Sequence, residues 1–275
     1  MKSNCFEGVV VEFICPVIYE KNWTNTCSFY NIYCMRTTEY IKNNIDRLPN
    51  GYVFTCNDFM DQVESREALV KALNRLAASG RIVKLAKGRY YKPEPSPFGE
   101  LPPSQYQTVK DLLESQGKIF GYLTGLSMYN SLGLTTQVGN IIQIGRNEIR
   151  SSFKRGKYTI SFVKQKNRIT KENIPLLQLL DGLRFIKKIP DSSIGSSCRI
   201  LQNRIENLSE KEQRAMVRLA MKYPPVTRAL LGAILCDLGQ DEITGKLKES
   251  LNPLTSYIIP GVSKAVSSAA EWSIK

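Results

Sequence analysis

The chain of 275 residues carries 38 Lys and Arg against 25 Asp and Glu, a formal net charge of +13, and contains no histidine. The lack of histidine excludes Ser-His-Asp and Cys-His nucleophiles, His-ligated zinc or iron, and an imidazole proton shuttle. The excess of positive charge favours a polyanionic partner. With 42% hydrophobic residues, the chain has enough apolar surface for two modest folded domains.

The cysteine pattern and the start of the chain limit the kinds of site further. Seven cysteines, an odd number without a C-x-x-C pair, argue against a metal site and a disulfide framework. No apolar stretch approaches the roughly 20 residues that span a bilayer, so we expect a soluble protein in a reducing cytoplasm. We also expect no cofactor. Residues 1–34 show no lasting helical or strand period. We interpret them as an extension outside the folded domains, either disordered or translated from a misplaced start codon.

Residues 35–92 are expected to form one small module. Apolar spacing and capping residues predict a helix that ends before Pro49, an extended piece at residues 52–54, and helices over 57–63 and 66–79. A hairpin should follow, with strands at residues 81–85 and 89–92 and a turn in which Gly88 can take a positive φ. This order predicts a winged helix-turn-helix, which places its second helix in the DNA major groove and its hairpin beside the backbone.

The charges of this module fit double-stranded DNA as the partner. The third helix and the hairpin carry side chains that can donate to guanine edges or phosphates. These candidate DNA-binding residues are Arg66, Lys71, Asn74, Arg75, Arg81, Lys84, Lys87 and Arg89. Such a charge run can also be only a solvated face. We favour DNA because a basic helix and a basic hairpin at this spacing are two coupled features.

Beyond the module, the sequence predicts a second, mixed α+β domain. Residues 93–103 contain five prolines and should be a stiff, extended linker. Residues 104–261 should contain a small sheet and a helical C-terminal part, and residues 262–275 a frayed tail. The expected helices lie near residues 104–116, 122–132, 171–180, 210–222, 226–238 and 241–251, and the strands near 140–144 and 157–163.

One stretch of the second domain is the most basic in the chain. Between residues 146 and 168 a single acid, Glu148, stands among Arg146, Arg150, Lys154, Arg155, Lys157, Lys164, Lys166 and Arg168. These residues are candidates for a second polyanion surface. They equally fit a strand edge that lysines protect from pairing, and the sequence leaves both interpretations open.

Motifs for catalysis are incomplete. Pro190-Asp191 resembles the start of a metal-dependent nuclease motif, but the further acid and lysine that such a site needs do not follow. There is no GxxxxGK[ST] phosphate loop. We therefore expect no catalytic and no metal-binding residues, and a metal-dependent DNA-processing enzyme is the least favoured function.

Several segments resemble the AbiEi-type antitoxins of bacterial type IV toxin-antitoxin systems. In the first module these are residues 51–55, 69–76, 80–82 and 87–91; in the second domain they are residues 121–125, 132–137 and 227–233. The resemblance covers residues 35–261. It implies a winged helix that binds operator DNA and represses its own operon, and a second domain that counters a co-encoded nucleotidyltransferase-like toxin without an obligatory tight complex. The alternative is a stand-alone winged-helix regulator whose second domain senses a ligand or dimerises.

Overall fold

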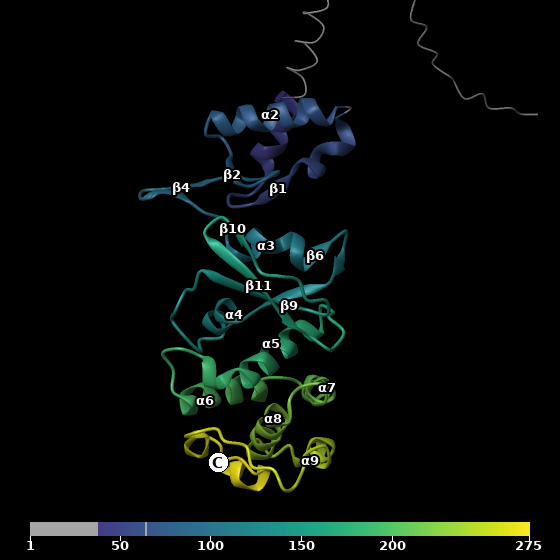
Figure 1. Ribbon diagram of the computed structural model, residues 1–275, viewed down its shortest axis with the longest axis vertical. Coiled ribbons are helices and arrows are strands. Elements are labelled where there is room, and N and C mark those ends of the chain that lie inside the picture. Colours follow the sequence, from purple (N-terminus) through teal and green to yellow (C-terminus); the bar gives the residue numbers. More distant parts are fainter. Residues whose placement is uncertain (1–37, 64) are drawn as a thin grey trace, which may run out of the picture.

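The computed structural model describes residues 38–63 and 65–275. The extension predicted for residues 1–34 lies outside the described residues. The molecule is elongated and layered along its long axis (Figure 1). Helix α2 lies at one end, two sheets follow in succession, and a group of helices with the C-terminus forms the other end. The mixed α+β class with small sheets and C-terminal helices is confirmed.

The first layer is built from three helical segments. Residues 38–47 are helical, and Ile41 and Ile45 are fully buried. The second segment, η1 (Cys56–Gln62), is a 3-10 helix, and Asp58 fixes its start by accepting a hydrogen bond from the Thr55 backbone N–H at 2.6 Å. Helix α2 (Arg66–Ala78) begins where Ser65 accepts a hydrogen bond from the third residue of the helix. All three lie where the sequence predicts helix.

A three-stranded sheet supports these helices. Its strands are β1 (Val53–Thr55), β2 (Val83–Ala86) and β3 (Arg89–Tyr91), in the order β1-β3-β2. Gly88 turns the β2–β3 hairpin with a φ of 70°, as expected. Tyr90 and Tyr91 are both buried, and the Tyr90 ring stacks on Phe54 with centroids 6.3 Å apart. Neither tyrosine is therefore available to a ligand.

A small arm joins the two parts of the chain. The segment expected as an extended linker contains two short strands, β4 (Glu94–Ser96) and β5 (Gly99–Leu101), which pair as an antiparallel hairpin. Gly99 allows the turn with a φ of 106°. The hairpin projects sideways from the body of the molecule (Figure 1).

The central layer is a four-stranded sheet covered by helix α3 (Gln105–Leu113). The strand order is β10-β11-β9-β8, and β9 and β11 run parallel while the outer pairs are antiparallel. The strands are β8 (Gly121–Thr124), β9 (Ile141–Arg146), β10 (Phe153–Arg155) and β11 (Tyr158–Lys164). Val109 and Leu112 of α3 pack on Ile142, Ile144 and Ile160 of the sheet. The sequence predicted β9 and β11 but not β10.

The prediction of a helix over residues 122–132 is wrong for the first third of that range. Residues 121–124 form β8, which pairs with β9, and helix α4 (Leu126–Ser131) begins only afterwards. Gly125 separates the two with a φ of 71°, and a side chain at this position would collide with Gln143. Two further short strands, β6 (Glu114–Ser115) and β7 (Lys118–Ile119), form a tight turn after α3.

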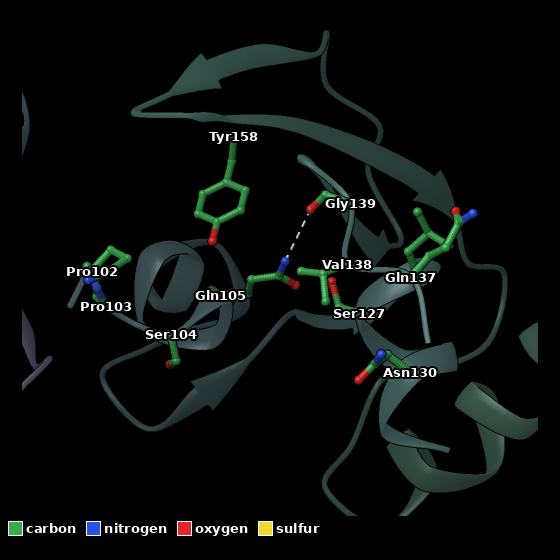
Figure 2. A pocket seen from close by; sticks show the side chains of 11 residues that line it. Pro102, Pro103, Ser104, Gln105, Ser127, Asn130, Gln137, Val138, Gly139 and Tyr158 are labelled. Atoms are coloured by element: carbon green, nitrogen blue, oxygen red, sulfur yellow. Dashed lines mark hydrogen bonds between the residues drawn. The ribbon is translucent and has the colours of Figure 1, made fainter. Parts of the chain in front are cut away.

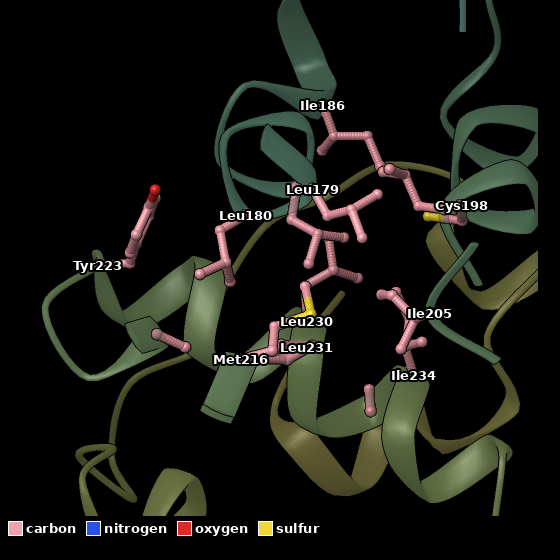
Figure 3. Packing of buried hydrophobic residues seen from close by; sticks show 14 of the residues in the cluster. Leu179, Leu180, Ile186, Cys198, Ile205, Met216, Tyr223, Leu230, Leu231 and Ile234 are labelled. Atoms are coloured by element: carbon pink, nitrogen blue, oxygen red, sulfur yellow. The ribbon is translucent and has the colours of Figure 1, made fainter. Parts of the chain in front are cut away.

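The C-terminal layer is helical and holds the largest core. Its main helices are α5 (Asn173–Arg184), α6 (Ile194–Glu206), α7 (Glu210–Ala220), α8 (Pro225–Asp237) and α9 (Gly245–Glu249). Leucines of α5 and α8, with Ile205 of α6 and Met216 of α7, meet in this core (Figure 3). Helix α6, capped by Ser193, was not expected from the sequence.

The tail is not frayed, and that prediction is wrong. Residues after 261 form the short 3-10 helices η4 (Val262–Lys264) and η5 (Ser267–Trp272). Asp237 accepts hydrogen bonds from the backbone N–H groups of Ser267 at 2.7 Å and Ser268 at 2.8 Å. Trp272 is 2% exposed and packs against Gly232 of α8. The composition of the tail is small and polar, but one tryptophan anchors it.

A buried carboxyl joins the sheet to the helices. Asp181 of α5 accepts hydrogen bonds from the hydroxyls of Tyr122 at 2.8 Å, Thr124 at 2.9 Å and Tyr223 at 2.9 Å. Gln165 donates to both tyrosine oxygens at 2.9 Å. Burial raises the pKa of Asp181, although the three hydroxyls and Arg184 act in the opposite direction.

Candidate nucleic-acid interface

Helix α2 presents a basic face to solvent. Leu69, Leu73 and Leu76 are buried under the helix, whereas Lys71, Asn74 and Arg75 are exposed on the opposite side and Arg66 is exposed at the start of the helix. The helix lies at the outer end of the molecule, with the sheet behind it (Figure 1). A duplex could therefore approach these side chains without meeting the second domain.

The β2–β3 hairpin adds further cations. Lys84 and Lys87 are exposed, and Lys87 stands in the turn between the strands. Among residues 38–63 and 65–275, no ion pair engages Lys71, Lys84 or Lys87. Their charges are thus not neutralised within the described part of the molecule.

Arg81, Arg89 and Asn74 are candidate DNA-binding residues whose side chains make hydrogen bonds to other parts of the protein. Arg81 makes a forked contact with Asp46 at 2.6–3.2 Å, and this hydrogen bond lowers the pKa of the Asp46 carboxyl. Arg89 is half-buried and donates to Asp111 at 2.8 Å. Asn74 accepts a hydrogen bond from the Tyr90 hydroxyl at 2.9 Å. Asn74 and Arg81 make contacts within the first module, and Arg89 connects it to α3, so Arg66, Lys71, Lys84 and Lys87 are the better candidates for DNA contacts. Arg75 remains an exposed candidate on α2.

Asp111 of α3 is a junction that the sequence does not reveal. Besides Arg89, it binds Arg155 of β10 at 2.6 Å, and Arg155 also donates to the Thr108 carbonyl at 2.8 Å. One carboxylate therefore connects the β2–β3 hairpin, α3 and the sheet. Its partners lie 22 and 44 residues away in the chain, so no local pattern could have indicated them.

The basic stretch of the second domain divides into buried and exposed cations. Arg155 is 6% exposed and Arg146 is 8% exposed, with its guanidinium over the Phe120 ring at 4.6 Å. Burial also lowers the pKa of Arg146. These two residues therefore do not belong to a polyanion surface. The other six side chains are exposed, namely Arg150, Lys154, Lys157, Lys164, Lys166 and Arg168.

Two of these exposed lysines border the first module. Lys154 and Lys157 flank the β10–β11 turn, where Gly156 lies close to Leu85 of the β2–β3 hairpin. The turn and the hairpin are therefore neighbours, although they are about 70 residues apart in the sequence.

An open pocket of about 340 Å³ lies beside the base of the arm. Figure 2 shows its wall, in which Gln105 donates to the Gly139 carbonyl. The lining residues are Pro102, Pro103, Ser104, Gln105, Leu126, Ser127, Asn130, Gln137, Val138, Gly139 and Tyr158. None of them carries a charge or a thiol. This composition suits binding rather than acid-base or metal chemistry.

Two absences apply to the described residues. Within 38–63 and 65–275, no group of three Cys, Asp or Glu side chains is placed to hold a metal ion. In the same part of the chain, no helix is both long and apolar enough to cross a membrane.

Comparison with known proteins identifies the family. The chain belongs to a family of unknown function, DUF6088, whose model matches residues 40–217. It is also similar to the crystal structure of the RV2827C protein from Mycobacterium tuberculosis, with a TM-score of 0.53 and 14% identity over 88% of this chain and 90% of that chain. At that identity the likeness concerns the fold alone. No curated protein matches the chain.

Proposed function

We propose that the first module is a winged helix-turn-helix that binds double-stranded DNA. The main supporting observation is the exposed basic face of α2, where Lys71 and Arg75 lie opposite the buried leucines and Arg66 is exposed at the start of the helix. In this class of fold the second helix of the pair enters the major groove. The β2–β3 hairpin, with Lys84 and Lys87, would then act as the wing on the DNA backbone.

The contacts behind α2 support this role. The Tyr90 hydroxyl donates a hydrogen bond to Asn74 of the helix, and Arg81, just after the end of the helix, donates to Asp46. Asp111 links the wing to the second domain through Arg89 and Arg155. A helix and wing fixed in this way need little reorganisation on binding, which lowers the entropic cost of association.

We further propose that the chain is an antitoxin that represses its own operon and counters a nucleotidyltransferase-like toxin. The support is the resemblance to AbiEi-type antitoxins over residues 35–261. The second candidate is a lone transcription regulator, favoured by the uncharged pocket beside the arm, which could hold a small ligand. Co-expression separates the two: an antitoxin should restore growth of cells that express a toxin gene adjacent to its own, and a lone regulator should not.

DNA binding is expected to weaken steeply with salt. Five exposed cations on α2 and the wing would each release counterions from a phosphate, so log affinity against log salt should have a slope of about −4 to −5. Fluorescence anisotropy with a labelled duplex at several salt concentrations measures it. Lys246→Gln, on the far helix α9, serves as the control and should leave the slope unchanged. A flat slope would remove the electrostatic basis of the proposal.

Substitutions in the helix and in the wing should have different effects on DNA affinity. Arg75→Ala should cost about 1–3 kcal/mol on a duplex selected from a random pool and much less on random DNA, because a guanidinium can bind guanine in a bidentate manner. Lys87→Ala should weaken binding to both duplexes alike and reduce the salt slope by about one, because it removes a phosphate contact. Competition titrations with both duplexes measure these effects. If only the wing variant changed sequence preference, the orientation on DNA would be reversed.

A further inference from the structure

The β4–β5 arm carries an aromatic side chain that nothing in the described chain covers. Phe98 stands at the tip of the arm and is 99% exposed, and Leu101 nearby is 44% exposed. A two-stranded hairpin in water is at best marginally stable by itself. An apolar tip on a projecting arm is therefore expected to find a partner surface.

A recess suited to an aromatic ring lies at the base of the same arm. Pro102 and Pro103, directly after β5, form one wall of the open pocket, and Leu126, Val138 and Tyr158 form others (Figure 2). The remaining lining includes the polar side chains of Ser104, Gln105, Ser127, Asn130 and Gln137. Val138 is 80% exposed, so the apolar part of the lining is itself uncovered. Only three residues of chain lie between Phe98 at the tip and Pro102 at the recess, a span of about 13 Å when extended.

The charges of the arm indicate what kind of partner it meets. The chain as a whole has a net charge of +13, yet residues 93–103 contain two acids, Glu94 and Glu100, and no basic residue. Beside the recess, Lys157 lies over the Tyr158 ring with its Nζ 5.3 Å from the centroid. An acidic arm and a basic rim on one chain are complementary between two copies of that chain.

We propose that two copies associate by exchanging arms, so that Phe98 of each copy occupies the recess of the other. A two-fold axis beside the arms makes such contacts reciprocal, because the same patch serves both subunits. Phe98 then fills the recess next to Tyr158, and Glu100, two residues further along, approaches Lys157 of the partner copy. The partner thus covers the apolar wall of a recess that is open in the single chain.

Sedimentation velocity of the full chain over a range of concentrations tests the association. The parent chain should form a dimer, and Phe98→Ala should weaken dimerisation about 30-fold or more, as expected for a central aromatic anchor. Leu254→Ala is the matched control, since Leu254 is 92% exposed on a different part of the surface. It should leave the dimer intact. Because Phe98 makes no buried contact within the single chain, its replacement should not change the thermal unfolding midpoint at concentrations where both chains are monomeric.

Charge reversal tests the geometry of the exchange. Glu100→Lys and Lys157→Glu should each weaken the dimer, because each places like charges together, and the two substitutions combined should restore it. A chain that is monomeric at all concentrations, or a dimer that tolerates Phe98→Ala, overturns the proposal. Failure of the double variant to recover overturns the pairing of Glu100 with Lys157. These measurements contain no DNA, so their outcome is independent of the proposed function.

Discussion

Gly232→Val is expected to destabilise the fold by about 3–5 kcal/mol. Gly232 lies in α8 directly under Trp272, and any Cβ at this position would overlap the Cζ3 and Cη2 atoms of the indole ring. The ring is 2% exposed, so it can yield only by leaving its site, which costs about as much as deleting a buried tryptophan. Urea unfolding followed by circular dichroism measures the loss.

The control for this substitution is Gly245→Val in α9. A Cβ at Gly245 meets nothing within 4 Å, and this glycine has no positive φ. Its replacement should therefore change the free energy of unfolding by no more than about 0.5 kcal/mol. If Gly232→Val were equally mild, Trp272 would not anchor the tail, and the packing of η5 on α8 would be of little importance to stability.

Local signals made the first module predictable. Leu69, Ala72, Leu73 and Leu76 recur at helical spacing, and Ser65 marks the start of their helix, so α2 could be predicted almost to the residue. Gly88 likewise marks the hairpin turn, because few other residues adopt its positive φ. In both cases the information lies within one turn of the element that it determines.

Errors arose where distant contacts decide the structure. Residues 121–124 directly precede the residues of α4 and were predicted as part of the same helix, but pairing with β9 makes them a strand. The tail is rich in Ser and Ala, and its order depends on Trp272 packing against a glycine 40 residues earlier. A single sequence carries no record of which segments will meet.

In the candidate interface, too, some features could be predicted from local sequence and others depend on distant contacts. Exposure follows the helical period, so the solvent-facing positions of Lys71 and Arg75 could be inferred, and Arg66 is exposed because it begins the helix. Charge alone did not distinguish Arg155, which is buried against Asp111, from the exposed Lys154 beside it. Arginines that bind carboxylates within the protein and arginines that face solvent look alike in a sequence. Only the fold separates them.

Asp181→Ala is expected to cost about 3–5 kcal/mol of folding stability. The substitution removes the common acceptor of the Tyr122, Thr124 and Tyr223 hydroxyls, and a buried donor left without a partner costs about 1–3 kcal/mol. The three losses are coupled, so their sum is not additive. Urea unfolding measures the effect, and the exposed Glu249→Ala is the control, with an expected change below about 0.5 kcal/mol.

Asp181→Asn adds a test of the charge. Burial raises the pKa of Asp181 in the folded chain above its unfolded value of about 3.9, so the folded state binds this proton more tightly. The stability that this raised pKa contributes is fully present below about pH 3.9 and is lost as the pH rises through the folded pKa. Asparagine does not titrate. The unfolding free energy of the parent minus that of the variant should therefore increase as the pH falls from 7 towards 4. Parallel urea titrations of the two proteins measure this difference. A difference that stayed constant would mean that the pKa of Asp181 is the same in both states, and one that shrank would mean that its three hydroxyl donors outweigh the desolvation.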